Sequence, residues 1–306
     1  MAAEKPSRVL VTGGRGFIGR AVVKLLQRHG YHVISIDKAS AGEEESDSHV
    51  ELFGDICDYM HMQQLFERTR IDGIVHLAAI LPTAAIRDPS DATFVNIGGS
   101  HVLLNLAKKF GVRRFVFGSS LSVYGTYPAD HVVTEMDRAA PEDLYGTAKF
   151  YVEQLGAEYR KNGGPEFVAL RIGRVVGAGA ESSTSPWRSQ IFELLGTADS
   201  TEISIPYAST ERILLAHVED VAKMLVTLLV AERTGHCVYN AVCESVVVGE
   251  LKEQLERLNP RLRVELGGED VVGNPRSLDS SRFAREFGFE SVPVFDLLSE
   301  AAGQRK

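Results

Sequence analysis

The sequence lacks the features of several large protein classes. It contains no uninterrupted apolar run long enough to cross a bilayer, and its first eight residues are polar rather than an apolar secretory leader. Only three cysteines occur, Cys57, Cys237 and Cys243, without C-x-x-C spacing, so we expect neither a disulfide framework nor a metal site. The sequence also has fewer basic than acidic residues. Its 33 Lys and Arg and 41 Asp and Glu give a net charge of −8. This balance disfavours nucleic acid and anionic membranes. We therefore expect a cytoplasmic protein whose partners are small molecules or a second copy of itself.

Short apolar runs rich in β-branched residues alternate with helical patterns through the first 170 residues. The runs cover residues 8–12, 32–36, 50–54, 73–78, 114–119 and 167–171. Most are continuously apolar, which is typical of parallel strands that helices cover on both faces. The sequence therefore predicts a doubly wound α/β domain over residues 1–171. Residues 172–306 are less regular and are expected to form mainly a smaller substrate lobe.

A glycine-rich stretch, TGGRGFIG, follows the first predicted strand. It places Gly13, Gly16 and Gly19 between that strand and an amphipathic helix. Glycines in this context permit a tight turn and bring backbone N–H groups and a helix N-terminus close to a pyrophosphate. The stretch therefore predicts a dinucleotide site.

Two acidic residues follow the next predicted strands. Asp37 lies 18 residues beyond Gly19, where a carboxylate binds the ribose hydroxyls of NAD and repels the 2′-phosphate of NADP. Arg15 and Lys38 are nearby cations that would weaken this preference. Asp55 is either a partner for the adenine amine or a turn cap. We expect NAD as the cofactor.

Tyr145 and Lys149 stand four residues apart in a predicted helix. Such residues share one helix face, so the ammonium group can stand beside the phenol. Lowering a tyrosine pKa from about 10 to about 7 requires roughly 4 kcal/mol of preferential interaction, and a neighbouring cation supplies part of it. The spacing predicts an acid/base pair for alcohol oxidation or carbonyl reduction.

Taken together, these motifs resemble those of the extended short-chain dehydrogenase/reductases, the NAD-dependent epimerase/dehydratase family. Further matches are HLAA at 76–79, VNIGG at 95–99, GSSLSVYG at 118–125, YGTAK at 145–149, LRIGRVVG at 170–177 and HVEDVA at 217–222. The resemblance implies a Rossmann-type domain with an interleaved C-terminal lobe and a catalytic set of Ser120, Tyr145 and Lys149. It also implies a homodimer through helices near 91–110 and 144–160. The expected cofactor contacts are Gly13, Gly16, Phe17, Ile18, Gly19, Asp37, Asp55, Ile56, Leu77, Ala78, Ala79, Asn96, Tyr145 and Lys149.

The residues after Ser120 narrow the reaction that the resemblance implies. Leu121 and Ser122 stand where dehydratases and decarboxylases of the family have acidic residues, so those reactions are not expected. We expect an NAD-dependent oxidoreductase that transfers hydride at a secondary alcohol or ketone carbon of a sugar-like or small anionic substrate. A UDP-sugar 4-epimerase with retained NAD is the alternative, and a non-enzymatic NAD-sensing regulator is a third. The expected substrate contacts are Ser120, Ser122, Arg174, Arg212 and Arg276.

Overall fold

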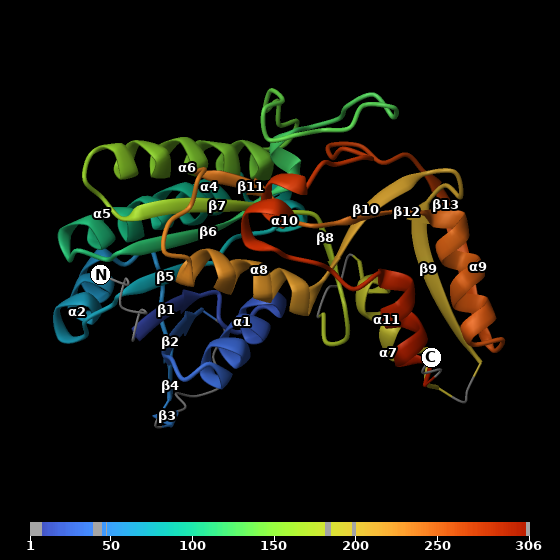
Figure 1. Ribbon diagram of the computed structural model, residues 1–306, viewed down its shortest axis with the longest axis horizontal. Coiled ribbons are helices and arrows are strands. Elements are labelled where there is room, and N and C mark those ends of the chain that lie inside the picture. The colour runs from blue at the N-terminus through green and yellow to red at the C-terminus, as the bar shows by residue number, and fades with distance from the viewer. Residues whose placement is uncertain (1–7, 39–44, 47, 181–184, 198–199, 304–306) are drawn as a thin grey trace.

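The computed structural model describes residues 8–38, 45–46, 48–180, 185–197 and 200–303. Eight strands of this described part form the main sheet (Figure 1). They are β1 (Arg8–Thr12), β2 (His32–Asp37), β3 (Glu45–Ser46), β4 (His49–Phe53), β5 (Gly73–His76), β6 (Arg114–Ser120), β7 (Glu166–Ile172) and β11 (Val238–Asn240). Each predicted strand forms within two residues of its expected bounds. The apolar runs of all these strands except β4 are largely buried, because helices cover both faces of the sheet.

The strand order of this sheet is β11-β7-β6-β5-β1-β2-β4-β3. All neighbouring pairs are parallel except the short β3, which pairs antiparallel with β4. The chain winds outward from β1 in one direction through β2 and β4 and in the other through β5, β6 and β7. This arrangement is the doubly wound sheet that the sequence predicts, and the fold class is confirmed.

Helices cover both faces of the main sheet (Figure 1). On one face lie α1 (Phe17–Arg28) and α8 (Val218–Val230), whose Val22, Leu26 and Leu225 share one core cluster with the strands. On the other face lie α2 (Tyr59–Arg68), α5 (Ser100–Lys109) and α6 (Leu144–Lys161), with Met62 and Val152 in a second cluster. Shorter pieces are α3 (Pro82–Arg87), α4 (Pro89–Thr93), the π-helical η1 (Phe94–Gly99) and the 3₁₀-helical η2 (Leu121–Val123).

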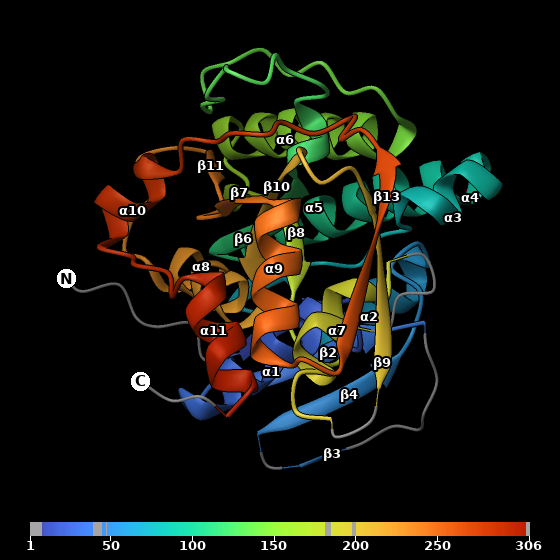
Figure 2. The ribbon, with the colours of Figure 1, turned by 90° about the vertical axis from the view of Figure 1, so that its right-hand side faces the viewer.

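A second region is built from later segments of the chain (Figure 2). Its strands are β8 (Arg174–Val176), β9 (Thr201–Tyr207), β10 (Arg212–His217), β12 (Glu244–Val247) and β13 (Leu262–Glu269). Strand β10 pairs with β8 and β12, and β9 pairs in parallel with β13. The helices are α7 (Trp187–Glu193), α9 (Val248–Leu258) and α11 (Val294–Ala301), whereas α10 (Ser281–Phe287) packs against β11 of the main sheet. A third core cluster that includes Trp187, Ile203 and Leu251 holds much of this region together.

The two regions interleave along the chain. Helix α8 and strand β11 follow residue 171, yet α8 packs against α1 and β11 pairs with β7 at the edge of the main sheet. Strand β8 follows β7 after a single residue and pairs with β10 instead. The carboxyl ends of β6 and β7 therefore lead directly toward the second region. Within the described residues, no helix is both long and apolar enough to cross a membrane.

Candidate active site

The glycine-rich turn connects β1 to α1 at the carboxyl edge of the main sheet. Gly13 has a φ of +71°, and a Cβ added there would lie 2.8 Å from the backbone nitrogen of Ala78. A Cβ added at Gly19 would lie 2.0 Å from the carbonyl oxygen of Gly13. Side chains at either position would therefore push the turn away from the sheet or from the loop after β5. The turn has the close backbone packing that a dinucleotide site requires.

The first turn of α1 fits a phosphate group. The N-cap of α1 is Gly16, which provides no side-chain hydrogen bond, and the first turn contains no acidic residue. In contrast, the side chains of Asp58 and Asp143 cap α2 and α6. Because the first N–H groups of a helix have no intrahelical partner, those of α1 can bind an anion. Phe17 and Ile18 begin this helix, and their side chains pack against the first core cluster.

Asp37 ends β2 beside the glycine turn, where its carboxylate accepts a 3.1 Å hydrogen bond from the backbone N–H of Arg15. The two cations that would weaken a preference for NAD are both paired with carboxylates. Arg15 forms an ion pair with Glu51, and the ammonium of Lys38 lies 2.9 Å from the carboxylate of Asp55. The carboxylate of Asp55 also accepts a 2.9 Å hydrogen bond from the backbone N–H of Cys57, as a turn cap does. These pairings match an NAD site better than an NADP site.

The loop after β5 is held in place by buried polar side chains. The Asn96 amide accepts a 2.7 Å hydrogen bond from the N–H of Ile80 and donates one of 2.9 Å to its carbonyl. His76 bonds the hydroxyl groups of Thr12 and Ser100 at 2.6 and 2.9 Å, and its burial lowers its pKa to about 3. Asn96 thus fixes the segment that contains the expected contacts Leu77, Ala78 and Ala79. The expected contact Ile56 contributes its side chain to the second core cluster.

The predicted catalytic residues lie on two elements that touch. Ser120 ends β6, while Tyr145 and Lys149 lie on the first turns of α6. The ammonium of Lys149 donates a 2.7 Å hydrogen bond to the carbonyl of Gly118 and lies 5.5 Å from the centroid of the Tyr145 ring. A Cβ added at Gly146 would lie 2.5 Å from the carbonyl oxygen of Ser122. The helix start and the strand end are therefore in close contact on both sides of Ser120.

The hydroxyl of Ser120 is held by its own turn. It accepts a 3.1 Å hydrogen bond from the backbone N–H of Ser122 and donates one of the same length to the Ser122 hydroxyl. Leu121 is buried in a small core cluster with Tyr124. Ser122 is therefore a direct neighbour of Ser120.

The groups that shift the pKa of Tyr145 do not include Lys149, which was expected to lower it. Burial and the carboxylate of Asp143 raise the pKa of Tyr145, and the cation that lowers it is Arg188. Burial also lowers the pKa of Lys149 to about 7. The reason is geometric, because the ammonium of Lys149 is directed at the Gly118 carbonyl and lies beside the phenol ring. The surrounding protein groups thus keep the phenol of Tyr145 protonated at neutral pH, which suits it to donate a proton.

A buried ion pair lies one helical turn beyond Lys149. Both carboxylate oxygens of Glu153 accept hydrogen bonds from Arg171 on β7, at 3.0 and 2.7 Å, and one also accepts from the hydroxyl of Ser119. The charge of Glu153 raises the pKa of Lys149 and so opposes part of the effect of burial. This pair joins α6, β6 and β7 beneath the site.

The three arginines expected to contact substrate have different surroundings. Arg276 forms a 2.8 Å ion pair with Glu211, and Arg212 is an exposed residue at the start of β10. Arg174 on β8 donates a 3.2 Å hydrogen bond to the hydroxyl of Tyr207. Arg188 on α7 is not among the residues predicted from the sequence, and its charge interacts with those of Arg174 and Tyr145. Its place directly after the lone tryptophan, Trp187, was the one signal available.

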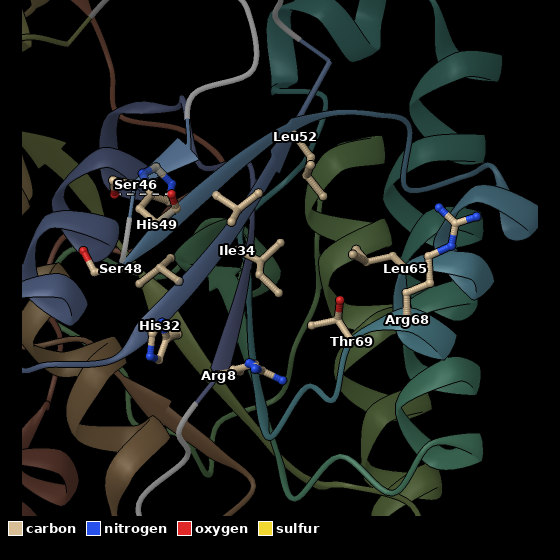
Figure 3. A pocket seen from close by; sticks show the side chains of 12 residues that line it. Arg8, His32, Ile34, Ser46, Ser48, His49, Leu52, Leu65, Arg68 and Thr69 are labelled. Carbon is tan, nitrogen blue, oxygen red and sulfur yellow. Dashed lines mark hydrogen bonds between the residues drawn. The ribbon is translucent and has the colours of Figure 1, made fainter.

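A hollow of about 750 Å³ lies elsewhere on the main sheet (Figure 3). Its lining includes Arg8 and His32, the first residues of β1 and β2, and Leu65 of α2. None of the candidate site residues lines it. Ligands of such folds bind beyond the carboxyl ends of the strands, so we assign it no role in the chemistry. Among the described residues, no group of three or more His, Cys, Asp or Glu is placed to hold a metal ion.

A family model and several known proteins match large parts of the chain. The model of the NAD dependent epimerase/dehydratase family matches residues 9–241. A UDP-glucose 4-epimerase of Lacticaseibacillus casei is 35% identical over 179 residues, which cover 57% of this chain and 54% of the relative. The mitochondrial L-threonine 3-dehydrogenase of Bos taurus is 25% identical over 294 residues, 92% of this chain and 78% of the relative. The chain thus spans about half the length of the epimerase it matches.

Solved structures resemble the chain over nearly its whole length. An L-threonine dehydrogenase from Clostridium difficile superposes with a TM-score of 0.85 at 21% identity, over 98% of both chains. The UDP-glucose 4-epimerase of Thermotoga maritima, solved with UDP-glucose, gives a TM-score of 0.82 at 26% identity, over 97% of this chain and 98% of that one. The same fold therefore carries both a dehydrogenase and an epimerase.

Proposed function

The chain belongs to the NAD-dependent epimerase/dehydratase family, as its motifs predict, and we propose on this premise that it is an NAD-dependent dehydrogenase. Its substrate would be a secondary alcohol, or the matching ketone, that is sugar-like or a small anion. The observation that carries the proposal is the contact between the end of β6 and the start of α6, which gathers Ser120, Tyr145 and Lys149. Threonine dehydrogenases that align with almost the whole chain support the same class of reaction.

Each residue of the catalytic set has a defined task in this proposal. Bound NAD supplies the hydride acceptor for oxidation and, when reduced, the hydride donor. Tyr145 exchanges the proton of the substrate oxygen, because it is the only phenol in the expected catalytic set. Ser120 donates a hydrogen bond to the same oxygen and orients it. Lys149 attaches the start of α6 to Gly118 and lies beside the phenol ring.

The cofactor site in this proposal uses residues already in position. The glycine turn and the uncapped start of α1 would hold the pyrophosphate, and Asp37 would bind the adenosine ribose. The pairing of Arg15 with Glu51 and of Lys38 with Asp55 supports NAD over NADP. Leu77, Ala78 and Ala79 would line the cofactor from the loop after β5.

A UDP-sugar 4-epimerase is the second candidate. It is supported by the 31–35% identity that four UDP-glucose 4-epimerases share with about half of the chain. The homodimer through the α4–α5 region and α6 and the cytoplasmic location stay predictions from the sequence. A non-enzymatic regulator is less favoured, because the chain retains both Tyr145 and Lys149.

One experiment distinguishes the two enzymes and tests the proposal. Purified protein is mixed with NAD and with candidate sugars, sugar acids and UDP-sugars, and the absorbance of NADH is followed together with product formation. A dehydrogenase releases NADH in proportion to product, whereas an epimerase interconverts UDP-sugars without net NADH. If the protein neither binds NAD nor converts any substrate of these classes, the proposal is wrong.

A further inference from the structure

Arg20 on α1 forms a bridge between two distant backbone segments. Its guanidinium donates a 2.7 Å hydrogen bond to the carbonyl of Arg15 and one of 2.6 Å to the carbonyl of Gly179. Arg15 lies in the glycine-rich turn between β1 and α1, whereas Gly179 follows β8 and lies 159 residues beyond Arg20 in the sequence. Because one planar group makes both bonds from two different nitrogens, it fixes the position of one segment relative to the other.

The segment at the far end of this bridge, residues 177–180, is held on its other side by α7. The backbone N–H of Gly179 donates a 2.7 Å hydrogen bond to the carboxylate of Glu193, and that of Gly177 donates one of 3.1 Å to the carbonyl of Arg188. Gly179 and Gly177 have φ angles of +87° and +138°, a backbone that favours glycine and gains much freedom when its bonds open. Gly179 therefore connects α1 to α7 through both polar groups of its own backbone.

Stabilisation of α1 alone does not explain Arg20. The residue lies near the start of the helix, where the helix dipole disfavours a cation. Its side chain is exposed, so it adds little to the hydrophobic core. Its two bonds instead join the turn that is expected to hold the pyrophosphate to the segment after β8, the strand that contains the expected substrate contact Arg174. Arg20 thus connects the cofactor region directly to the substrate region.

We propose that Arg20 is a positioning residue that couples the bound dinucleotide to the substrate lobe, so that a pyrophosphate on the glycine turn also orders residues 177–180. This inference rests on the proposed function, because it requires NAD on that turn. A bound pyrophosphate restricts the turn and the carbonyl of Arg15 with it, so less conformational entropy is lost when Arg20 also bonds Gly179. By linkage, bonds that fix residues 177–180 strengthen the binding of NAD by the same factor.

The first test measures hydrogen–deuterium exchange at the backbone N–H groups of Gly177 and Gly179 by mass spectrometry. The probes are NAD and ADP-ribose, which keeps the pyrophosphate and lacks the nicotinamide. In the wild type, either probe at saturation should slow exchange at both glycines about fivefold or more. In Arg20→Met, either probe should slow exchange in the glycine turn but leave Gly177 and Gly179 unchanged. Lys24→Met, a surface substitution one turn further along α1, is the control and should behave as the wild type does.

The second test is a double-mutant cycle on NAD affinity, measured by isothermal titration calorimetry. Glu193→Ala removes the acceptor of the Gly179 N–H group and lies outside the proposed cofactor site. It should weaken NAD binding about fivefold in the wild-type background and have no effect when Arg20→Met is already present. Arg20 and Glu193 are both exposed, so neither substitution disturbs the core and both variants are expected to fold.

The outcomes separate this inference from the proposed function. A wild type that binds NAD without slower exchange at Gly177 and Gly179 overturns the inference and leaves the proposed dehydrogenase standing. Slower exchange with NAD but not with ADP-ribose also overturns it, because the nicotinamide then contacts the segment directly. The inference fails equally if Arg20→Met keeps the effect of both probes, or if Glu193→Ala weakens NAD to the same extent with and without Arg20. A wild type that binds no NAD contradicts the proposed function and the inference together.

Discussion

The ammonium group of Lys149 donates a 2.7 Å hydrogen bond to the carbonyl oxygen of Gly118, which attaches the start of α6 to the end of β6. The lysine is almost fully buried, and its ammonium also lies 4.6 Å from the centroid of the Phe117 ring. Burial in these surroundings lowers its pKa to about 7, although Glu153 opposes the shift. Lys149 thus changes charge near neutral pH, which affects both stability and catalysis.

Lys149→Met is expected to change how the free energy of unfolding depends on pH. Between pH 7 and 10.5 the unfolded chain keeps the lysine proton while the folded protein loses it, so the wild type becomes more stable as the pH rises. The methionine variant lacks this gain. Relative to the variant, the wild type should gain about 2 kcal/mol between pH 7 and pH 9. Urea denaturation at several pH values measures this difference. Lys24→Met, a variant of a surface lysine, is the control, and its free energy of unfolding should depend on pH as that of the wild type does. If Lys149→Met also follows the pH dependence of the wild type, the pKa of Lys149 is not lowered in the folded protein.

Tyr145→Phe is expected to fold and still to bind NAD, because it removes only one hydroxyl group. Turnover should fall by about 100-fold or more, the usual contribution of a positioned proton donor. Steady-state kinetics with the substrate found by the NADH assay provides the measurement. Tyr151→Phe removes a hydroxyl from an exposed residue of the same helix and serves as the control. Equal turnover in both variants would exclude Tyr145 from proton transfer.

The sequence predicted the main sheet well because its signal is local. Most of the parallel strands are buried on both faces, and apolar runs such as residues 114–119 mark them with little ambiguity. Gly13 and Gly19 also belong to a local pattern, the glycine-rich stretch between a strand and a helix. The structure explains why glycine is needed there, because it leaves no room for a Cβ at either position. Asp37 could be placed by counting residues from this turn. These features depend on neighbours in the sequence.

Features that depend on distant segments were not predictable. The parallel pairing of β9 with β13 joins residues about 60 positions apart, and no local pattern indicates it. Arg188 resembles any other arginine in the sequence, and only the interaction of its charge with those of Arg174 and Tyr145 distinguishes it. The spacing of Tyr145 and Lys149 shows that they share one helix face, but not that the ammonium group is directed at the carbonyl of Gly118.

Gly13→Ala is expected to abolish NAD binding. The new Cβ would require a left-handed backbone conformation at φ +71° and would meet the backbone of Ala78 at 2.8 Å, so the glycine turn would move. Gly30→Ala is the matched control, because Gly30 has a φ of +79° with no atom within 4 Å of an added Cβ. The control should lose only about 1 kcal/mol of stability and keep its NAD affinity. Calorimetric titration with NAD compares the two, and equal affinities would place the cofactor elsewhere.

Asp37→Asn is expected to reduce the preference for NAD over NADP. The amide oxygen can still accept the hydrogen bond from the N–H of Arg15, so the turn should be retained, while the negative charge that repels a 2′-phosphate is removed. NAD affinity should fall about tenfold through loss of a charged hydrogen bond to the ribose, and NADP affinity should stay the same or rise. Asp130→Asn, in an exposed loop, is the control. Because Lys38 is paired with Asp55, adding Asp55→Asn frees this ammonium group and should strengthen NADP binding further. If the ratio of the two affinities does not change in either variant, Asp37 does not contact the adenosine ribose.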